Sequence, residues 1–231
     1  MIFYVVTKPM NELLFFATFL FTLALALLAF RLGKSYVFAF IATIGCIAIF
    51  VAPMVTTLFG FAIVLFEIFY AVIFFTTDLI SEHYGKKEAR SLVWLAVLVL
   101  VTVSVISALA VMFVPHAVDT IQPHVKAILE ISPRLIMATF LMFVIEQHFD
   151  IWFFHKLREK TKGGKLWLRN ILSTSTSQLI DVLIFYPLAF YGIYENLLEL
   201  MVAAYIFKVL MAFLDTPFIY LSRRFKPKEL G

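Results

Sequence analysis

The chain has 231 residues, of which 63% are hydrophobic and only 15% are charged, and its mean hydropathy is +0.98. This composition predicts an integral membrane protein and excludes a soluble enzyme. The net charge of +4 comes from basic residues beside apolar runs, where they indicate membrane topology and not a surface for nucleic acid.

Seven apolar runs are long enough to cross a bilayer as helices. Each approaches or exceeds the roughly 20 residues that span the hydrocarbon core, and none alternates like a strand of a membrane β-barrel. The predicted spans are 11–30, 36–57, 61–80, 92–114, 135–154, 171–191 and 197–221. The first run has no small-residue cleavage site behind it, so we expect a retained helix and not a signal peptide.

The fold class that follows is an all-α integral membrane protein, a polytopic bundle of seven transmembrane helices. Residues 53–60 leave an alternative, in which a re-entrant turn replaces the second loop and six full crossings remain. No linker divides the chain, so we expect residues 1–231 to form a single transmembrane domain.

Basic residues fall in every second loop. They are Arg31 and Lys34 after the first span, Lys86, Lys87 and Arg90 after the third, Lys156, Arg158, Lys160, Lys162, Lys165 and Arg169 after the fifth, and Arg223, Arg224, Lys226 and Lys228 after the seventh. The intervening loops hold few basic residues. The positive-inside rule therefore places the amino terminus outside and the carboxyl terminus in the cytoplasm, in the inner (cytoplasmic) membrane.

Two copies of one polar signature lie inside apolar runs, Gln147-x-x-Asp150 and Gln178-x-x-Asp181, 31 residues apart. A carboxylate at the centre of a bilayer costs about 2.5 to 3.5 kcal/mol, so each Asp indicates a group that must be gripped or neutralised. The two copies are either an internal inverted repeat or a chance match.

The sixth predicted span has a polar face formed by Thr174, Gln178 and Asp181, with Ser177 beside them. This face is too polar to contact lipid. Two interpretations remain open, hydrogen bonding between helices alone and direct contact of Gln178 or Asp181 with a substrate.

Other ionisable residues lie inside the predicted spans. Glu67 is deep in the third span, near Tyr70, and Asp78 lies toward its cytoplasmic end. Glu67 is either a neutral hydrogen-bonding group or a charge with a partner. Aromatic rings beside carboxylates and amides suit a flat, polar heterocycle, which gives Tyr70 a predicted role in binding.

Lys208 is the one lysine or arginine well inside a predicted span. Its candidate partners are Glu67, Asp150 and Asp181, and the sequence does not choose among them. Asp215 shares its helical face but lies about 10 Å away along the axis, too far for a direct bridge.

Motifs for catalysis are missing from the sequence. There is no Gly-x-Ser-x-Gly, no His-Glu-x-x-His and no glycine-rich phosphate loop, so we expect neither an enzyme nor a bound cofactor.

The segment 78–90, Asp-Leu-Ile-Ser-Glu-His-Tyr-Gly-Lys-Lys-Glu-Ala-Arg, resembles the hallmark stretch of the queuosine precursor transporter family, also called vitamin-uptake-transporter-like proteins. Three later stretches agree with it. They are Ser132-Pro133-Arg134 leading to Gln147 and Asp150, residues 166–170 leading to Gln178 and Asp181, and Lys208 followed by Asp215-Thr216-Pro217-Phe218. The resemblance covers roughly residues 60–221.

The resemblance implies uptake of a 7-deazaguanine for tRNA modification, either the nitrile precursor preQ0, the aminomethyl precursor preQ1 or queuine. The implied partners are this small molecule and the lipid bilayer, with no nucleic acid. A carboxylate can accept two hydrogen bonds from a guanine-like base while an amide reads its carbonyl edge. The predicted substrate-binding residues are Glu67, Tyr70, Asp78, Gln147, Asp150, Gln178, Asp181, Lys208 and Asp215.

The chain departs from the family pattern at two places. It has Ala52-Pro53 where the family often carries an Asn, and Phe66-Glu67 where the family often carries Phe-Pro. Glu67 is therefore a candidate specificity residue, which could pair with a cationic amine on the ligand.

The sequence leaves other functions open. The chain could be the binding subunit of a multi-subunit vitamin importer that needs an ATPase partner, or a structural membrane protein. A retinal protein is disfavoured because Ala204 stands one turn before Lys208, where that family usually has an acid. A homodimer is one alternative for the oligomeric state.

Overall fold

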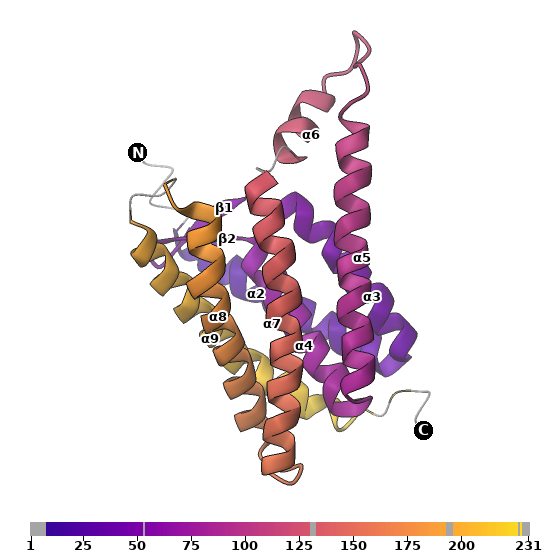
Figure 1. Ribbon diagram of the computed structural model, residues 1–231, viewed down its shortest axis with the longest axis vertical. Helices are drawn as coiled ribbons and strands as arrows, with labels where there is room; N and C mark the ends of the chain where they lie inside the picture. The colour runs from indigo at the N-terminus through magenta and orange to yellow at the C-terminus, as the bar shows by residue number, and fades with distance from the viewer. Residues whose placement is uncertain (1–7, 53, 130–132, 193–195, 226, 228–231) are drawn as a thin grey trace.

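The structure is a computed structural model in which residues 8–52, 54–129, 133–192, 196–225 and 227 are described. Long helices run along most of this part of the chain (Figure 1). They are α2 Lys8–Leu32, α3 Lys34–Val51, α4 Phe66–His83, α5 Lys86–Ala110, α7 Pro133–Lys160, α8 Leu166–Phe190 and α9 Leu197–Ser222, with a short helix α6 Gln122–Leu129 between α5 and α7.

Four of these helices are long and apolar enough to cross a membrane, over Met10–Leu32, Lys86–Ala110, Leu166–Phe190 and Leu197–Ser222. Their outward faces expose large apolar side chains, such as Trp94, Leu98 and Val105 on α5, which suits contact with lipid. Residues Lys34–Ala48 of α3 form a shorter apolar helix. The chain is therefore a helical membrane protein, as predicted.

The segment between α3 and α4 corrects the predicted boundaries of the second and third spans. Strand β1 Val55–Leu58 pairs antiparallel with β2 Phe61–Val64, so residues 55–57 and 61–64 are not helical. Phe59 and Gly60 both have positive φ, 51° and 93°, which is the geometry of a tight hairpin turn. Since the strands are rich in β-branched residues, local preference favours the hairpin over helix.

Other predicted boundaries also shift. The helices α5, α7 and α8 extend beyond the apolar runs into basic residues, reaching Lys86, Lys160 and Leu166. Hydropathy indicates the part of a helix that lies in the membrane but not where the helix ends, because the backbone hydrogen bonds of a helix can continue beyond the apolar segment. Pro53, in the predicted re-entrant turn, and Ser132, in the family motif, lie outside the described residues.

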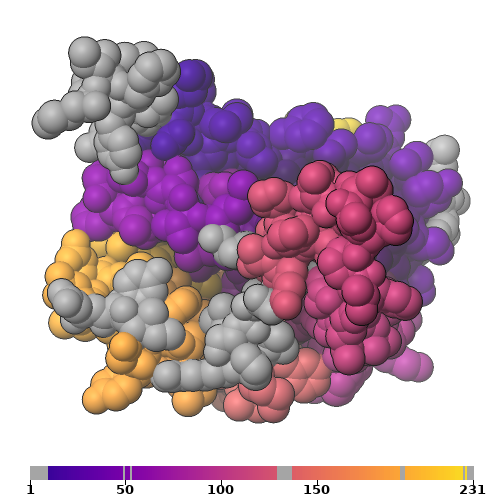
Figure 2. Space-filling model, turned by 90° about the horizontal axis from the view of Figure 1, so that it is seen from above, coloured from indigo at the N-terminus to yellow at the C-terminus, as the bar shows by residue number. Residues whose placement is uncertain are grey.

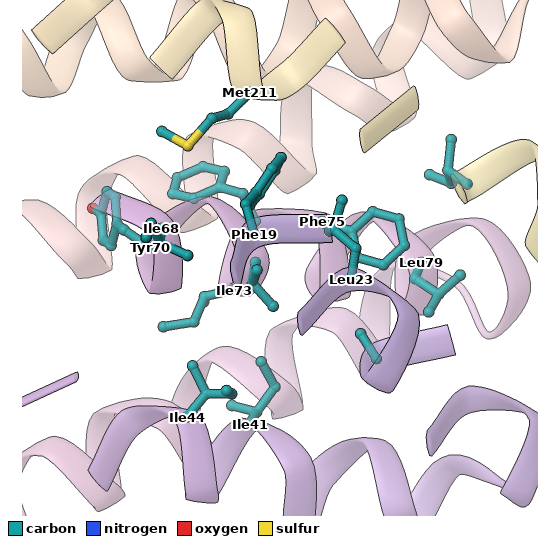
Figure 3. Close-up of a cluster of buried hydrophobic side chains, with 14 of the residues drawn as sticks. Phe19, Leu23, Ile41, Ile44, Ile68, Tyr70, Ile73, Phe75, Leu79 and Met211 are labelled. Atoms are coloured by element: carbon teal, nitrogen blue, oxygen red, sulfur yellow. The ribbon is translucent and has the colours of Figure 1, made fainter. Parts of the chain in front are cut away.

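An apolar core joins α2, α3, α4 and α9 (Figure 3). It includes Phe19 and Leu23 from α2, Ile41 and Ile44 from α3, Ile73 and Phe75 from α4, and Met211 from α9. Inside a bilayer, lipid is as apolar as these side chains, so close packing and not exclusion from water holds the helices together.

One end of the bundle carries the hairpin and α6, and Figure 2 views it from above. Glu12 ties α2 to this end, since its carboxylate oxygen Oε1 accepts a hydrogen bond of 2.8 Å from the backbone N–H of Phe59. The hairpin also contacts α9.

The opposite end gathers the basic residues of the alternate loops. The guanidinium of Arg31 lies 5.7 Å from the ring centre of Phe225, and Lys34 Nζ lies 3.1 Å from Glu88 Oε2. These contacts join the end of α2 to the segment after α9, and the start of α3 to the start of α5. The predicted clustering of positive charge on one side is thus present in space.

Glu82 is the centre of the ion pairs at this basic end. Its carboxylate lies 2.6 Å from Arg223, 3.0 Å from Arg169 and 3.9 Å from Arg158, so it joins α4 to α7, to α8 and to the segment after α9. Burial by itself would raise the pKa of Glu82, but the hydrogen bonds from Arg223 and Arg169 outweigh it and lower the pKa below its ordinary value of 4.5.

We expect Glu82→Gln to lower the free energy of unfolding by about 3 kcal/mol, because Arg169 is fully buried and would lose its counter-charge. The matched control is Glu88→Gln, whose partner Lys34 is half-exposed, with an expected loss below about 1 kcal/mol. Unfolding in detergent, followed by circular dichroism, measures both. Equal losses would contradict this account of the basic end.

The lowered pKa adds a pH dependence. A carboxylate with a depressed pKa stabilises the folded state above its ordinary pKa, and this contribution disappears as the pH falls through the folded-state value. The difference between the wild type and Glu82→Gln should therefore shrink in acid below pH 4.5.

Candidate functional site

Lys208 of α9 forms a buried ion-pair cluster with acids from two other helices. Its Nζ lies 3.1 Å from Glu67 Oε2 on α4 and 3.1 Å from Asp181 Oδ2 on α8, and the lysine is 4% exposed. Of the three partners left open by the sequence, the structure has Glu67 and Asp181 and does not have Asp150. One ammonium faces two carboxylates, so the three groups carry a net charge of −1 unless a carboxylate takes up a proton.

Two tyrosines complete the surroundings of this cluster. The hydroxyl of Tyr186 donates to Glu67 Oε1 at 3.1 Å, and the ring of Tyr70 lies under the ammonium, 4.5 Å from Nζ to its centre. The hydroxyl of Tyr70 donates to Glu146 Oε2. A cation over an aromatic face in a dry site gains electrostatic attraction, which adds to the ion pairs.

Glu146 is a buried acid that the sequence reasoning missed. It is fully buried on α7, next to Gln147 and bonded to Tyr70. The signal was available, because an acid inside an apolar run is costly and needs a partner.

A small internal cavity lies against this cluster. It is lined by Glu67, Tyr70, Ala71, Phe74, Thr174, Gln178, Lys208, Ala212 and Asp215. Its enclosed volume of about 10 Å³ has room for roughly one water molecule. A purine-sized ligand therefore requires the lining side chains, or α4, α8 and α9 themselves, to move apart.

Polar atoms in the cavity wall are available for a ligand. Gln178 is 2% exposed, and among the described residues its Oε1 has no hydrogen-bond partner. Asp215 Oδ1 accepts a hydrogen bond of 2.8 Å from Asn170 Nδ2, which fixes that carboxyl group at the wall. Ala71, Phe74 and Ala212 also line the cavity, and no sequence signal distinguished these residues from lipid-facing or core positions.

The first polar signature lies beside the cavity and not in its wall. Gln147 Oε1 accepts a hydrogen bond of 3.1 Å from Thr77, and Asp150 Oδ1 accepts one of 3.0 Å from Ser177. Asp78 Oδ2 accepts one of 3.3 Å from Thr174. Five of the nine predicted site residues line the cavity. Asp181 does not line it but forms an ion pair with Lys208, which does. The other three, Asp78, Gln147 and Asp150, form a polar layer beside the cavity.

The polar face of α8 makes the hydrogen bonds between helices that the sequence left open, while contact of Gln178 or Asp181 with a substrate stays a prediction. Ser177 bonds α8 to Asp150 of α7, and Thr174 bonds it to Asp78 of α4, which is hydrogen bonding between helices. Thr174 and Gln178 also line the cavity.

Apolar helices around a buried, charged cavity define an integral membrane protein of the transporter type. Residues 67–222 match a family model described as "Putative vitamin uptake transporter". A protein of Bacillus subtilis (strain 168) named "Probable queuosine precursor transporter" is 33% identical over 175 residues, which cover 74% of this chain and 76% of that protein. No solved structure matches.

The chain therefore belongs to the putative vitamin uptake transporter family. This confirms the resemblance found in the sequence and makes the protein a transporter and not an enzyme. The matched region begins at Glu67 and includes all nine predicted site residues.

A double-mutant cycle tests the partners of Lys208. We expect Lys208→Met and Glu67→Gln to be coupled by about 1 to 3 kcal/mol in the free energy of unfolding, because the two groups are in contact. The control cycle pairs Lys208→Met with Asp150→Asn, and its effects should add to within about 0.5 kcal/mol. Strong coupling in the control cycle alone would show that Asp150 is the true partner.

Proposed function

We propose that the protein imports queuosine precursors, which are 7-deazaguanine bases such as preQ0, preQ1 or queuine, across the cytoplasmic membrane. The observation that carries this proposal is the cavity of carboxylate, amide and aromatic groups buried between α4, α8 and α9. The name of the Bacillus subtilis relative supports the substrate class.

Gln178 and Asp215 are the groups that we expect to read the base. A guanine-like ring presents an N1–H and an exocyclic amine, which a carboxylate accepts as a pair, while an amide bonds the carbonyl edge. Both residues line the cavity, whereas Asp181 is already bonded to Lys208. The rings of Tyr70 and Phe74 supply apolar faces for the flat base.

The proposed arrangement in the membrane has seven crossings, formed by α2, α3, α4, α5, α7, α8 and α9 within a single domain of residues 1–231. The amino terminus lies outside and the carboxyl terminus in the cytoplasm. The gathering of Arg31, Arg158, Arg169 and Arg223 at one end supports this orientation.

Uptake of labelled 7-deazaguanines by cells that lack their own route tests the proposal. We expect the protein to restore uptake and Gln178→Ala to lower it about tenfold, because losing one buried hydrogen bond costs about 1 to 3 kcal/mol. The matched control on the same helix is Thr176→Ala, whose hydroxyl bonds only Leu172 of α8 itself among the described residues. Equal uptake by cells with and without the protein would refute the function.

The purified protein in liposomes separates a complete transporter from a binding subunit. Saturable exchange of labelled base by the protein alone excludes a requirement for an ATPase partner. Tight binding of the base without any exchange would favour the binding subunit.

Glu67 is proposed to favour a ligand with a cationic amine, because it lines the cavity and the cluster around Lys208 has an excess of negative charge. We expect Glu67→Gln to lower the ratio of preQ1 uptake to preQ0 uptake about tenfold, the scale of one charged hydrogen bond. Glu88→Gln removes a carboxylate outside the cavity and should leave the ratio unchanged. A ratio that Glu67→Gln does not alter counts against this role.

A further inference from the structure

Three buried aspartates next to the cavity have no cation. Asp78 of α4 and Asp150 of α7 are 0% exposed, and Asp215 of α9 is 2% exposed. Within the part of the chain that the structure describes, no lysine or arginine forms an ion pair with any of them. This separates them from Glu67, Asp181 and Glu82, which all have basic partners.

Asp78 of α4 and Asp150 of α7 are both bonded to one turn of α8, through the hydroxyls of Thr174 and Ser177. An ionised carboxylate can only accept hydrogen bonds, so these two groups offer each other no donor unless one of them holds a proton. Asp78 Oδ1 and Asp150 Oδ2 are buried and have no hydrogen-bond partner among the described residues. The remaining oxygens accept from the hydroxyls of Thr174 and Ser177.

The groups that face this pair are neutral or acidic. Helix α8 presents the hydroxyls of Ser173, Thr174 and Ser177, and α9 presents the carboxyl group of Asp215. The nearest charged groups on the same helices have other partners. Lys208 bonds Glu67 and Asp181, Arg169 bonds Glu82, and Glu146 bonds Tyr70.

Two ionised carboxylates held by one turn of α8, buried and without a cation, would repel each other and lose their hydration. The lower free energy belongs to the state in which the pair holds one proton. A buried acid of this kind inside a membrane marks a path for ions or protons.

The hydroxyl group of Thr174 connects Asp78 to the cavity. Thr174 lines the cavity and donates its hydroxyl hydrogen to Asp78, and Asp215 lines the same cavity. A base that takes a hydrogen bond from Thr174 would withdraw that bond from Asp78 and change how firmly the pair holds its proton.

We propose that Asp78 and Asp150 form a proton-binding site that couples import of the base to inward movement of one proton. This inference rests on the proposed function. The proton enters from the outside, is shared by the two carboxyl groups while the base occupies the cavity, and leaves to the cytoplasm with it. No covalent bond of the base changes.

Purified full-length protein in liposomes tests the coupling. An inward gradient of one pH unit should drive about tenfold accumulation of labelled preQ0, since one pH unit corresponds to a tenfold ratio for one proton per base. In a weakly buffered medium, addition of the base should also remove about one proton from outside for each base taken up. The nitrile preQ0 is the probe because it has no cationic amine, so the base itself does not bring an extra proton across the membrane.

The variants Asp78→Asn and Asp150→Asn should both bring the accumulation ratio from about tenfold to about onefold, whatever their rate of exchange. Glu88→Gln, at the surface, should keep the ratio of the wild type. Infrared spectra of the purified protein provide a readout without transport: the protonated carboxyl band of the wild type should contain a component that Asp150→Asn removes and Glu146→Gln keeps.

The outcomes separate this inference from the proposed function. Transport that ignores the pH gradient, follows a sodium gradient, or keeps its gradient response in both variants would overturn the proton site. The same holds for spectra in which Asp150→Asn removes no component of the protonated band. Absence of any exchange of a 7-deazaguanine by the wild type would instead refute the proposed function, and the infrared band would still show whether the pair holds a proton.

Discussion

The structure depends on one constraint, which is that a buried ammonium in an apolar bundle must have its charge balanced. Lys208 meets this constraint through Glu67 and Asp181, each 3.1 Å away, and so fixes α4 and α8 against α9. A single unpaired charge at this depth would cost about 2.5 to 3.5 kcal/mol on insertion scales. The cavity lies against this contact, since Glu67 and Lys208 both line it.

The sequence predicted the composition of the site better than its connections. Hydropathy and charge placed the long helices and the basic end, and the cost of burying charge singled out Lys208 and its candidate partners. The choice between Asp150 and Asp181 depends on how α7 and α8 are rotated against α9, which helical periodicity does not determine. The hairpin was missed although Phe59-Gly60 between β-branched residues favours a tight turn. Apolar cavity residues such as Phe74 carry no signal of their own.

The two Gln-x-x-Asp signatures show why a short pattern does not fix a role. Both lie on long helices that pack against each other, yet Gln178 reaches the cavity while Gln147 bonds Thr77 beside it. Asp181 bonds a cation, whereas Asp150 accepts a hydrogen bond from the neutral hydroxyl of Ser177. The partner across the helix interface decides the chemistry of each carboxylate. The family model matches from Glu67, so α2, α3 and the hairpin lie outside the matched residues, and α2 and α3 contribute to the apolar core.

Prolines stand at opposite ends of the antiparallel pair α8 and α9. Pro187 lies near the end of α8 and Pro217 near the end of α9, with the contact between Asp181 and Lys208 between them. Each proline removes one backbone hydrogen bond and lowers the bending stiffness of its helix. The missing backbone bonds thus lie toward opposite ends of the pair, away from the contact between Asp181 and Lys208, where bending of either helix would least disturb the ion pair.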